Sequence, residues 1–182
     1  MDISEHVKVT CLPNARKVAS EWRAKLVCSL LDAGLPAGNH PRIATGSHVI
    51  ALMDDRERAD ATTDFDKKLA PMMDIIAEHV SLPAPRLLFH CHTGVSRSTA
   101  AAYGAIAMLV GKGRETEAFG ELLKITHKPW PNRRVVEVFD DFLGRSGALL
   151  EPLDDMRARF PMRLEHYRRF NRRRGIISKY QR

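Results

Sequence analysis

Residues 86–110 read RLLFHCHTGVSRSTAAAYGAIAMLV, an apolar run followed by a polar segment and an alanine-rich run. Residues 86–91 form a short apolar run, which is typical of a buried central strand. Residues 98–109 are rich in alanine and predict a helix that ends at Gly111. The polar segment between them therefore predicts a tight loop from the end of a strand to the start of a helix. Such a loop directs backbone N–H groups and a helix N-terminus at one point, where an anion can bind.

Two side chains of this loop suit phosphate chemistry. Cys91 ends the predicted strand and Arg97 begins the predicted helix six positions later, so both face one tetrahedral group if the loop curls around it. The field of the loop and the adjacent guanidinium favour the thiolate form of Cys91. Arg97 can hold two phosphate oxygens at once, which a lysine cannot do. Gly94 allows the backbone to bend tightly around the ligand.

The rest of the chain predicts strands that alternate with helices. Further strands are expected over residues 6–11 and 47–53, and further helices over residues 14–31, 64–79, 115–126 and 133–143. This alternation indicates an α/β domain with a largely parallel sheet.

Composition excludes several classes of protein. The chain has 182 residues, of which 44% are hydrophobic and 28% charged, so it is neither collagen-like, nor disordered, nor a coiled-coil rod. Its three cysteines are too few and too scattered for a disulfide scaffold or a four-cysteine metal site. The first ten residues lack the features of a secretory signal, and the apolar run over residues 99–110 is too short to span a bilayer. We therefore expect no metal, no cofactor, no membrane span and a cytoplasmic location.

The positive charge is concentrated at the C-terminal end. Residues 156–182 hold ten Lys or Arg and one acid, a net charge of +9, which leaves −2 of the total of +7 for the remainder. Such a cluster attracts anionic partners, here nucleic acid or acidic lipid, although a solvated terminal helix is the simpler interpretation. The helical spacing of Phe160, Leu164, Tyr167 and Phe170 predicts that this helix docks one face on the body.

The loop resembles the active-site loop of the protein tyrosine phosphatase superfamily, which reads His-Cys-(five residues)-Arg-Ser/Thr. His90, Cys91, Gly94, Arg97 and Ser98 fall on the motif positions. Over about residues 5–150 the chain looks most like small bacterial dual-specificity-type phosphatases. The resemblance implies a three-layer α/β fold, with a central, mostly parallel sheet flanked by helices, as a catalytic domain over residues 1–150. Residues 151–182 are then a basic C-terminal helical extension.

The resemblance also implies roles for individual residues. Cys91 is the nucleophile, and Ser98 donates a hydrogen bond to its sulfur as the sulfur leaves. His90 orients the thiolate, and Asn132, which follows Pro131, braces the loop while it can also cap the next helix. The phosphate-binding residues are His92, Thr93, Gly94, Val95, Ser96 and Arg97.

Dual-specificity members place a general-acid aspartate after the strand that precedes the last helix before the loop. Asp55 is the preferred candidate, 36 residues before Cys91. Its neighbour Asp54 competes with it, and Asp64 and Asp66 remain as further alternatives.

The expected activity is hydrolysis of phosphotyrosine, with phosphoserine and phosphothreonine left open, through a phosphocysteine intermediate. The substrate is a phosphorylated protein or a small phosphomonoester. One alternative is a phosphate-binding pseudophosphatase or adaptor with an anion-binding tail, and another is a rhodanese-like sulfurtransferase. Cys11 and Cys28 are both candidates to pair with Cys91 under oxidation, and sequence separation does not decide between them.

Overall fold

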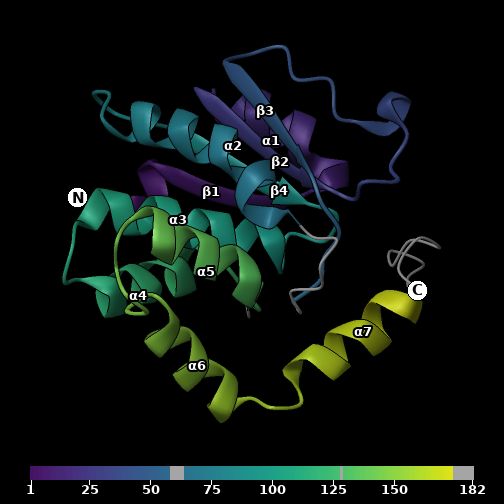
Figure 1. Ribbon diagram of the computed structural model, residues 1–182. Coiled ribbons are helices and arrows are strands. Elements are labelled where there is room, and N and C mark those ends of the chain that lie inside the picture. The colour runs from purple at the N-terminus through teal and green to yellow at the C-terminus, as the bar shows by residue number, and fades with distance from the viewer. Residues whose placement is uncertain (58–63, 128, 174–182) are drawn as a thin grey trace.

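The computed structural model describes residues 1–57, 64–127 and 129–173 (Figure 1). Its centre is a parallel sheet of four strands, in the order β1-β4-β2-β3. The strands are β1 (Val7–Cys11), β2 (Leu26–Leu31), β3 (Ser47–Leu52) and β4 (Leu87–Cys91). The two central strands β2 and β4 are buried at every position, as expected for strands covered on both faces. This architecture confirms the predicted α/β fold with its parallel sheet.

The prediction of one helix over residues 14–31 was wrong. Helix α1 (Ala15–Glu21) ends early, and the chain then enters strand β2 at Leu26. Between them Arg23 adopts a φ of +52°, a left-handed conformation that breaks the helix. Because β2 is buried on both faces, its apolar residues do not alternate with polar ones, and their spacing therefore continued the helical pattern of α1 by coincidence.

Helices cover the two faces of the sheet unequally. On one face, α1 packs Ala19 against Val27 and Leu88. On the other face lie α2 (Phe65–Val80), α3 (Arg97–Val110), α4 (Glu115–Ile125) and α5 (Arg133–Phe142), which share the main core with strands β1 to β4. Helix α3 is buried from Arg97 to Ala107, because it lies between the sheet and the helices α4 and α5. The N-terminus of α3, which begins at the candidate loop, is therefore fixed by the core.

Two further helices complete the chain. Helix α6 (Leu150–Arg159) packs on α4 and α5 and buries Leu153 and Met156. Helix α7 (Arg163–Arg173) extends away from the body (Figure 1). Leu164 contacts the main core, but Phe160 and Phe170 are about half exposed, so the prediction that all of these apolar residues dock on the body was wrong. Among the described residues, no helix combines the length and apolar character that crossing a bilayer requires.

Gly104 allows α5 to approach α3 closely. A Cβ atom at this position would overlap the ring of Phe139, whereas one at Gly120 on α4 would meet nothing within 4 Å. We expect Gly104→Ala to lower the free energy of unfolding by about 1–3 kcal/mol, because the overlap outweighs the better helix propensity of alanine. Gly120→Ala is the matched control and should be neutral or stabilising. Urea unfolding of both variants measures the difference, and equal effects would contradict this packing.

Candidate active site

The loop between β4 and α3 is built on the end of strand β1. Gly94 has a φ of +72°, and a Cβ atom there would lie 2.7 Å from the carbonyl oxygen of Thr10. Only glycine fits both conditions without strain. The backbone N–H of Leu12 also donates to the carbonyl of His92 at 3.3 Å, so the loop follows directly on the pairing of the two strands. The predicted strand–loop–helix arrangement is therefore present.

Cys91, Arg97 and Ser98 come together at this loop. The sulfur of Cys91 lies 3.1 Å from the hydroxyl oxygen of Ser98, and both side chains are buried. Arg97 is also buried, with 1% of its surface exposed. Burial opposes the charge on Arg97, but the negative groups of Asp55, Cys91 and Asp32 outweigh it and raise the pKa of the guanidinium. Arg97 is therefore a permanent cation beside the sulfur.

The guanidinium of Arg97 is held from one side and unsatisfied on another. Its Nη1 lies 2.8 Å from a carboxylate oxygen of Asp32 and donates to the carbonyl of Met53. Its Nε is buried and finds no hydrogen-bond partner among the described residues. An unpaired buried donor is costly, so this N–H is suited to an incoming anion.

Among the four candidate acids, the structure brings Asp55 to the loop. One of its oxygens accepts from the hydroxyl of Ser96 at 2.7 Å and from the side-chain amide of Asn132 at 2.8 Å. Its other oxygen lies 3.9 Å from Nε of Arg97. The side chain remains 23% exposed, so a proton can be exchanged with solvent or with a substrate.

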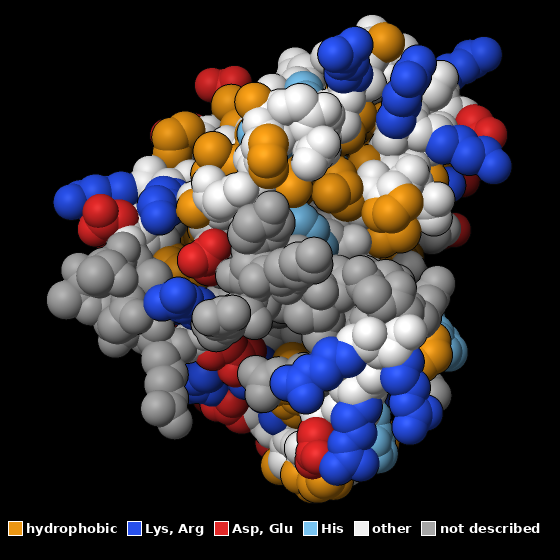
Figure 2. All heavy atoms as spheres, turned by 90° about the vertical axis from the view of Figure 1, so that its right-hand side faces the viewer, with side chains coloured by type: hydrophobic (Ala, Val, Ile, Leu, Met, Phe, Trp, Pro, Cys, Tyr) orange, Lys and Arg blue, Asp and Glu red, His pale blue; other side chains and the backbone are white. Residues whose placement is uncertain are grey.

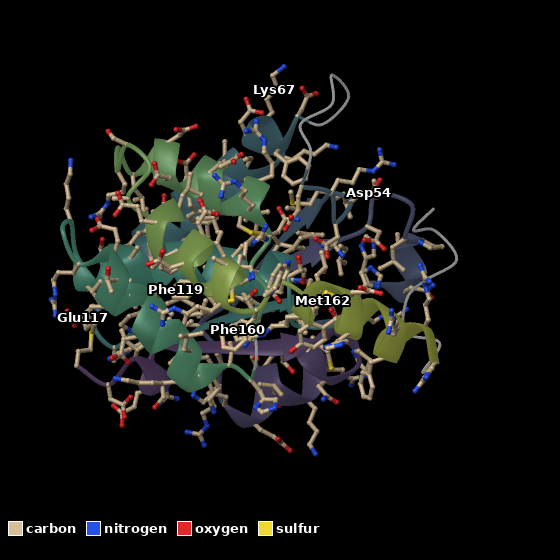
Figure 3. The ribbon with its side chains drawn as sticks, turned by 90° about the horizontal axis from the view of Figure 1, so that it is seen from below. Asp54, Lys67, Glu117, Phe119, Phe160 and Met162 are labelled. Atoms are coloured by element: carbon tan, nitrogen blue, oxygen red, sulfur yellow. The ribbon has the colours of Figure 1, made fainter. Side chains whose placement is uncertain are left out.

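The other three aspartates lie away from these contacts. Asp54 lies at the margin of the molecule (Figure 3), where it pairs with Arg56 at 3.9 Å and accepts from the N–H of Ala33 at 3.4 Å. Asp64 precedes α2 and pairs with Lys67 at 3.8 Å, and Asp66 is exposed in the first turn of that helix. The alternation of side chains along the chain after β3 thus separates Asp55 from its neighbour.

Asn132 both caps a helix and braces the loop. Its side-chain oxygen accepts from the N–H of Val135 at 3.1 Å, which caps α5. Its backbone N–H donates to the carbonyl of Ser96 at 3.3 Å, and the N–H of Trp130 donates to the carbonyl of Val95 at 2.9 Å. The segment before α5 therefore holds the far side of the loop at the same time as it holds Asp55.

His90 is a fully buried residue of β4, directly before Cys91. Its Nε2 is 2.5 Å from the hydroxyl of Ser29, which is in turn 2.7 Å from Nε2 of His48. Burial, followed by the repulsion of His48 and His92, lowers the pKa of His90 to about 3. His90 is therefore neutral at physiological pH and acts as a hydrogen-bonded support.

His92 is a residue of the loop, and its side chain contacts Asp32. Its Nε2 is 3.2 Å from the second carboxylate oxygen of Asp32. Burial lowers the pKa of His92, and the Asp32 carboxylate opposes this shift without cancelling it. His92 is thus mostly neutral near pH 7, and it adds positive charge to the loop only at more acidic pH.

Asp32, which was not among the predicted site residues, contacts both Arg97 and His92. It directly follows β2, and the carboxyl ends of parallel strands meet at one edge of a sheet, so a correct assignment of β2 would have indicated it. Glu57, also not predicted, accepts hydrogen bonds from Arg157 of α6 and from the N–H of Arg133. This bridge ties the segment that carries Asp55 to α5 and α6. Within the described parts of the chain, no group of three His, Cys, Asp or Glu side chains is arranged to hold a metal ion.

The chain is similar to known proteins in structure but not detectably in sequence. No protein-family model matches the chain, and no curated protein matches its sequence. Solved structures do match. The human tyrosine phosphatase-like serine/threonine/tyrosine-interacting protein aligns with a TM-score of 0.57 at 14% identity, over 75% of this chain and 89% of the other.

Two further structures give a similar result. Human DUSP28 aligns with a TM-score of 0.57 at 15% identity, over 78% of this chain and 94% of the other. PTPMT1 in complex with PI(5)P aligns with a TM-score of 0.54 at 14% identity, over 81% and 96%. At such identities the likeness concerns the fold. This chain has the fold of the protein tyrosine phosphatase superfamily, in the form shared by the dual-specificity phosphatases.

Proposed function

We propose that this protein hydrolyses phosphomonoesters, phosphotyrosine first among them, through a phosphocysteine intermediate. The observation that carries the proposal is the buried Nε of Arg97, which has no hydrogen-bond partner among the described residues and lies 3.9 Å from the Asp55 carboxyl. The same guanidinium interacts electrostatically with Cys91. A phosphate dianion is the ligand that satisfies this N–H together with the backbone N–H groups of the loop.

The reaction proceeds in two steps. The Cys91 thiolate attacks phosphorus in line, the bond to the ester oxygen breaks, and protonated Asp55 gives its proton to the leaving oxygen. Arg97 and the backbone N–H groups of residues 92–97 stabilise the equatorial oxygens as charge moves onto them. Asp55 then takes a proton from water, which attacks phosphorus and releases the thiolate, while Ser98 donates a hydrogen bond to the departing sulfur.

Two other functions use parts of the same site. A pseudophosphatase or adaptor needs Arg97 and the loop but no turnover, and a rhodanese-like sulfurtransferase needs the cysteine but no acid. Neither accounts for Asp55, which Ser96 and Asn132 hold beside the guanidinium. Among substrates, a phosphorylated protein is preferred to a phosphoinositide, because the loop contains no lysine. PTPMT1, one of the structural neighbours, binds PI(5)P, so this lipid phosphate is the runner-up substrate.

The first prediction concerns the nucleophile. Cys91→Ser should lower the turnover of p-nitrophenyl phosphate, measured with EDTA present, by a factor on the order of 10³ or more, because the attacking thiolate is lost. Cys11→Ser is the matched control and should retain turnover near that of the wild type. Thermal stabilisation by vanadate, retained in Cys91→Ser, shows that the loop is still folded. Equal turnover of wild type and Cys91→Ser would overturn the assignment.

The second prediction separates Asp55 from Asp54. Asp55→Asn should lower kcat for phenyl phosphate by about 10²–10³, because the poor leaving group needs a proton. The loss should be smaller for p-nitrophenyl phosphate, whose leaving group is more stable as an anion. Asp54→Asn, its exposed neighbour, should leave both rates unchanged. If neither variant changes turnover, another residue is the acid. An assay of sulfur transfer from thiosulfate to cyanide then tests the alternative of a rhodanese-like sulfurtransferase.

We also propose that the segment around α7 takes an anionic partner, and that this partner is an acidic lipid surface. Met162, Phe160 and Phe170 are about half exposed among the arginines of this segment. Phe160 and Met162 lie where α6 meets α7 (Figure 3), and Lys and Arg side chains gather at the lower edge of the face that contains α7 (Figure 2). The guanidinium of Arg163 covers the Phe160 ring at 3.9 Å, which leaves that face unavailable for stacking on a base. Apolar side chains among cations fit the boundary between headgroups and acyl chains.

A vesicle experiment tests the lipid partner. The protein should sediment with vesicles that contain both phosphatidylcholine and phosphatidylserine, and the bound fraction should fall as the salt concentration is raised. It should not sediment with vesicles of phosphatidylcholine alone. The double variant Phe160→Ser and Met162→Ser should weaken binding by about tenfold or more, since two apolar contacts are lost. Leu82→Ser, an equally exposed leucine beyond α2, is the control. Binding to a short RNA but not to the anionic vesicles would replace this partner with nucleic acid.

A further inference from the structure

Arg157 of helix α6 lies where two segments of the candidate site meet. Its guanidinium binds both carboxylate oxygens of Glu57, one of them from Nη1 at 3.0 Å. Its Nη2 also donates to the carbonyl of Pro131 at 2.7 Å. The same guanidinium lies over the ring of Trp130, with Cζ 4.8 Å from the ring centre. One side chain of α6 therefore holds the segment after β3 and the segment before α5 against each other.

These contacts are largely shielded from water. The side chain of Arg157 is 16% exposed and that of Glu57 is 32% exposed, while Trp130 is buried. A guanidinium that binds both oxygens of a carboxylate fixes the orientation of the pair as well as its distance. The pairing thus differs from the exposed ion pairs of helix surfaces, which contribute little. Arg159, two residues further along α6, is exposed and provides a comparison on the same helix.

The segment that Arg157 holds is the one that carries Asp55. Glu57 follows Asp55 by two residues, so its bonds to Arg157 restrain the chain close to the proposed acid. The side-chain amide of Asn132 holds the same segment nearer its start, where it donates to Asp55 at 2.8 Å and to the carbonyl of Arg56 at 3.2 Å. Asn132 and Arg157 therefore hold this short segment at two points.

The phosphate loop has supports of its own. Gly94 contacts the end of β1, and the backbone N–H groups of Trp130 and Asn132 donate to carbonyls of the loop. Asn132 is fully buried and caps α5, which packs on α3. Backbone bonds and core packing therefore hold the loop without a contact to Arg157. Loss of the Arg157 side chain should free the segment of Asp55 more than it frees the loop.

We propose that Arg157 is a positioning residue for proton transfer, which places the Asp55 carboxyl through its bonds to Glu57 and Pro131. This inference rests on the proposed function, because it takes Asp55 as the general acid. Arg157 itself touches no reacting atom. A displacement of about 1 Å in a reacting group can lower a rate on the order of 10²-fold, so a restraint two residues away from the acid affects turnover. Helix α6, which was expected to belong to a C-terminal extension, then contributes to catalysis.

The kinetic test compares Arg157→Met with the matched control Arg159→Met in the full chain. Arg157→Met should lower kcat for phenyl phosphate by about tenfold or more, and kcat for p-nitrophenyl phosphate by less than about threefold. The two substrates differ because the poorer leaving group depends more strongly on the proton. KM should stay within about twofold of wild type for both, since the contacts of the phosphate with the loop are kept. Arg159→Met should leave all of these values unchanged.

Further variants keep the test independent of a folding defect in α6. Glu57→Ala removes the other partner of the pair and should show the same dependence on the leaving group. The double variant Glu57→Ala and Arg157→Met should lose no more than the worse single variant, because the two residues act as a unit. Arg157→Lys should recover part of the lost kcat, since the charge remains but lysine cannot bind both carboxylate oxygens in one plane.

Hydrogen exchange gives a readout that needs no turnover. Backbone amides in the peptide that covers residues 52–57 should exchange faster in Arg157→Met than in Arg159→Met. If the wild type hydrolyses no phosphomonoester but exchange changes in this way, the phosphatase assignment is contradicted, while Arg157 still positions this segment. Unchanged kcat in both Arg157→Met and Glu57→Ala would overturn the positioning role. Equal losses for the two substrates, or unchanged exchange, would overturn it as well.

Discussion

Arg97 carries its charge inside the protein, and the carboxylate of Asp32 lies 2.8 Å from its Nη1. A buried guanidinium without such a partner would be severely destabilising. The pairing uses Nη1, which also donates to the carbonyl of Met53, and Nε has no hydrogen-bond partner within the described part of the chain. One end of the guanidinium is thus anchored to the strand ends, and the other end is available to a ligand. The loop and Asp55 lie on the side of the guanidinium that carries Nε.

The loop is held from both sides so that its backbone N–H groups keep one orientation. On one side Gly94 contacts the end of β1, and on the other side the segment before α5 donates to the carbonyls of Val95 and Ser96. The same segment holds Asp55 through Asn132. Because the loop and the Asp55 carboxyl share these supports, their positions relative to each other are fixed by the fold.

Cys11 lies on the neighbouring strand β1, in register with Cys91. Helix α7 extends away from the body (Figure 1).

The sequence alone determined the loop, its flanking strand and helix, and the candidates Cys91, Arg97 and Ser98, because these residues are local to one another and their chemistry depends on fixed spacing. It also indicated the acidic pair at residues 54 and 55, but only the fold showed which of the two faces the loop. The contact of Asp32 with Arg97, and the register that pairs Cys11 with Cys91, could be found only in the tertiary structure. The spacing of strands along the chain does not determine their order in the sheet. Strand β2 was not predicted, because burial on both faces removes the alternation of apolar and polar residues by which a strand is recognised.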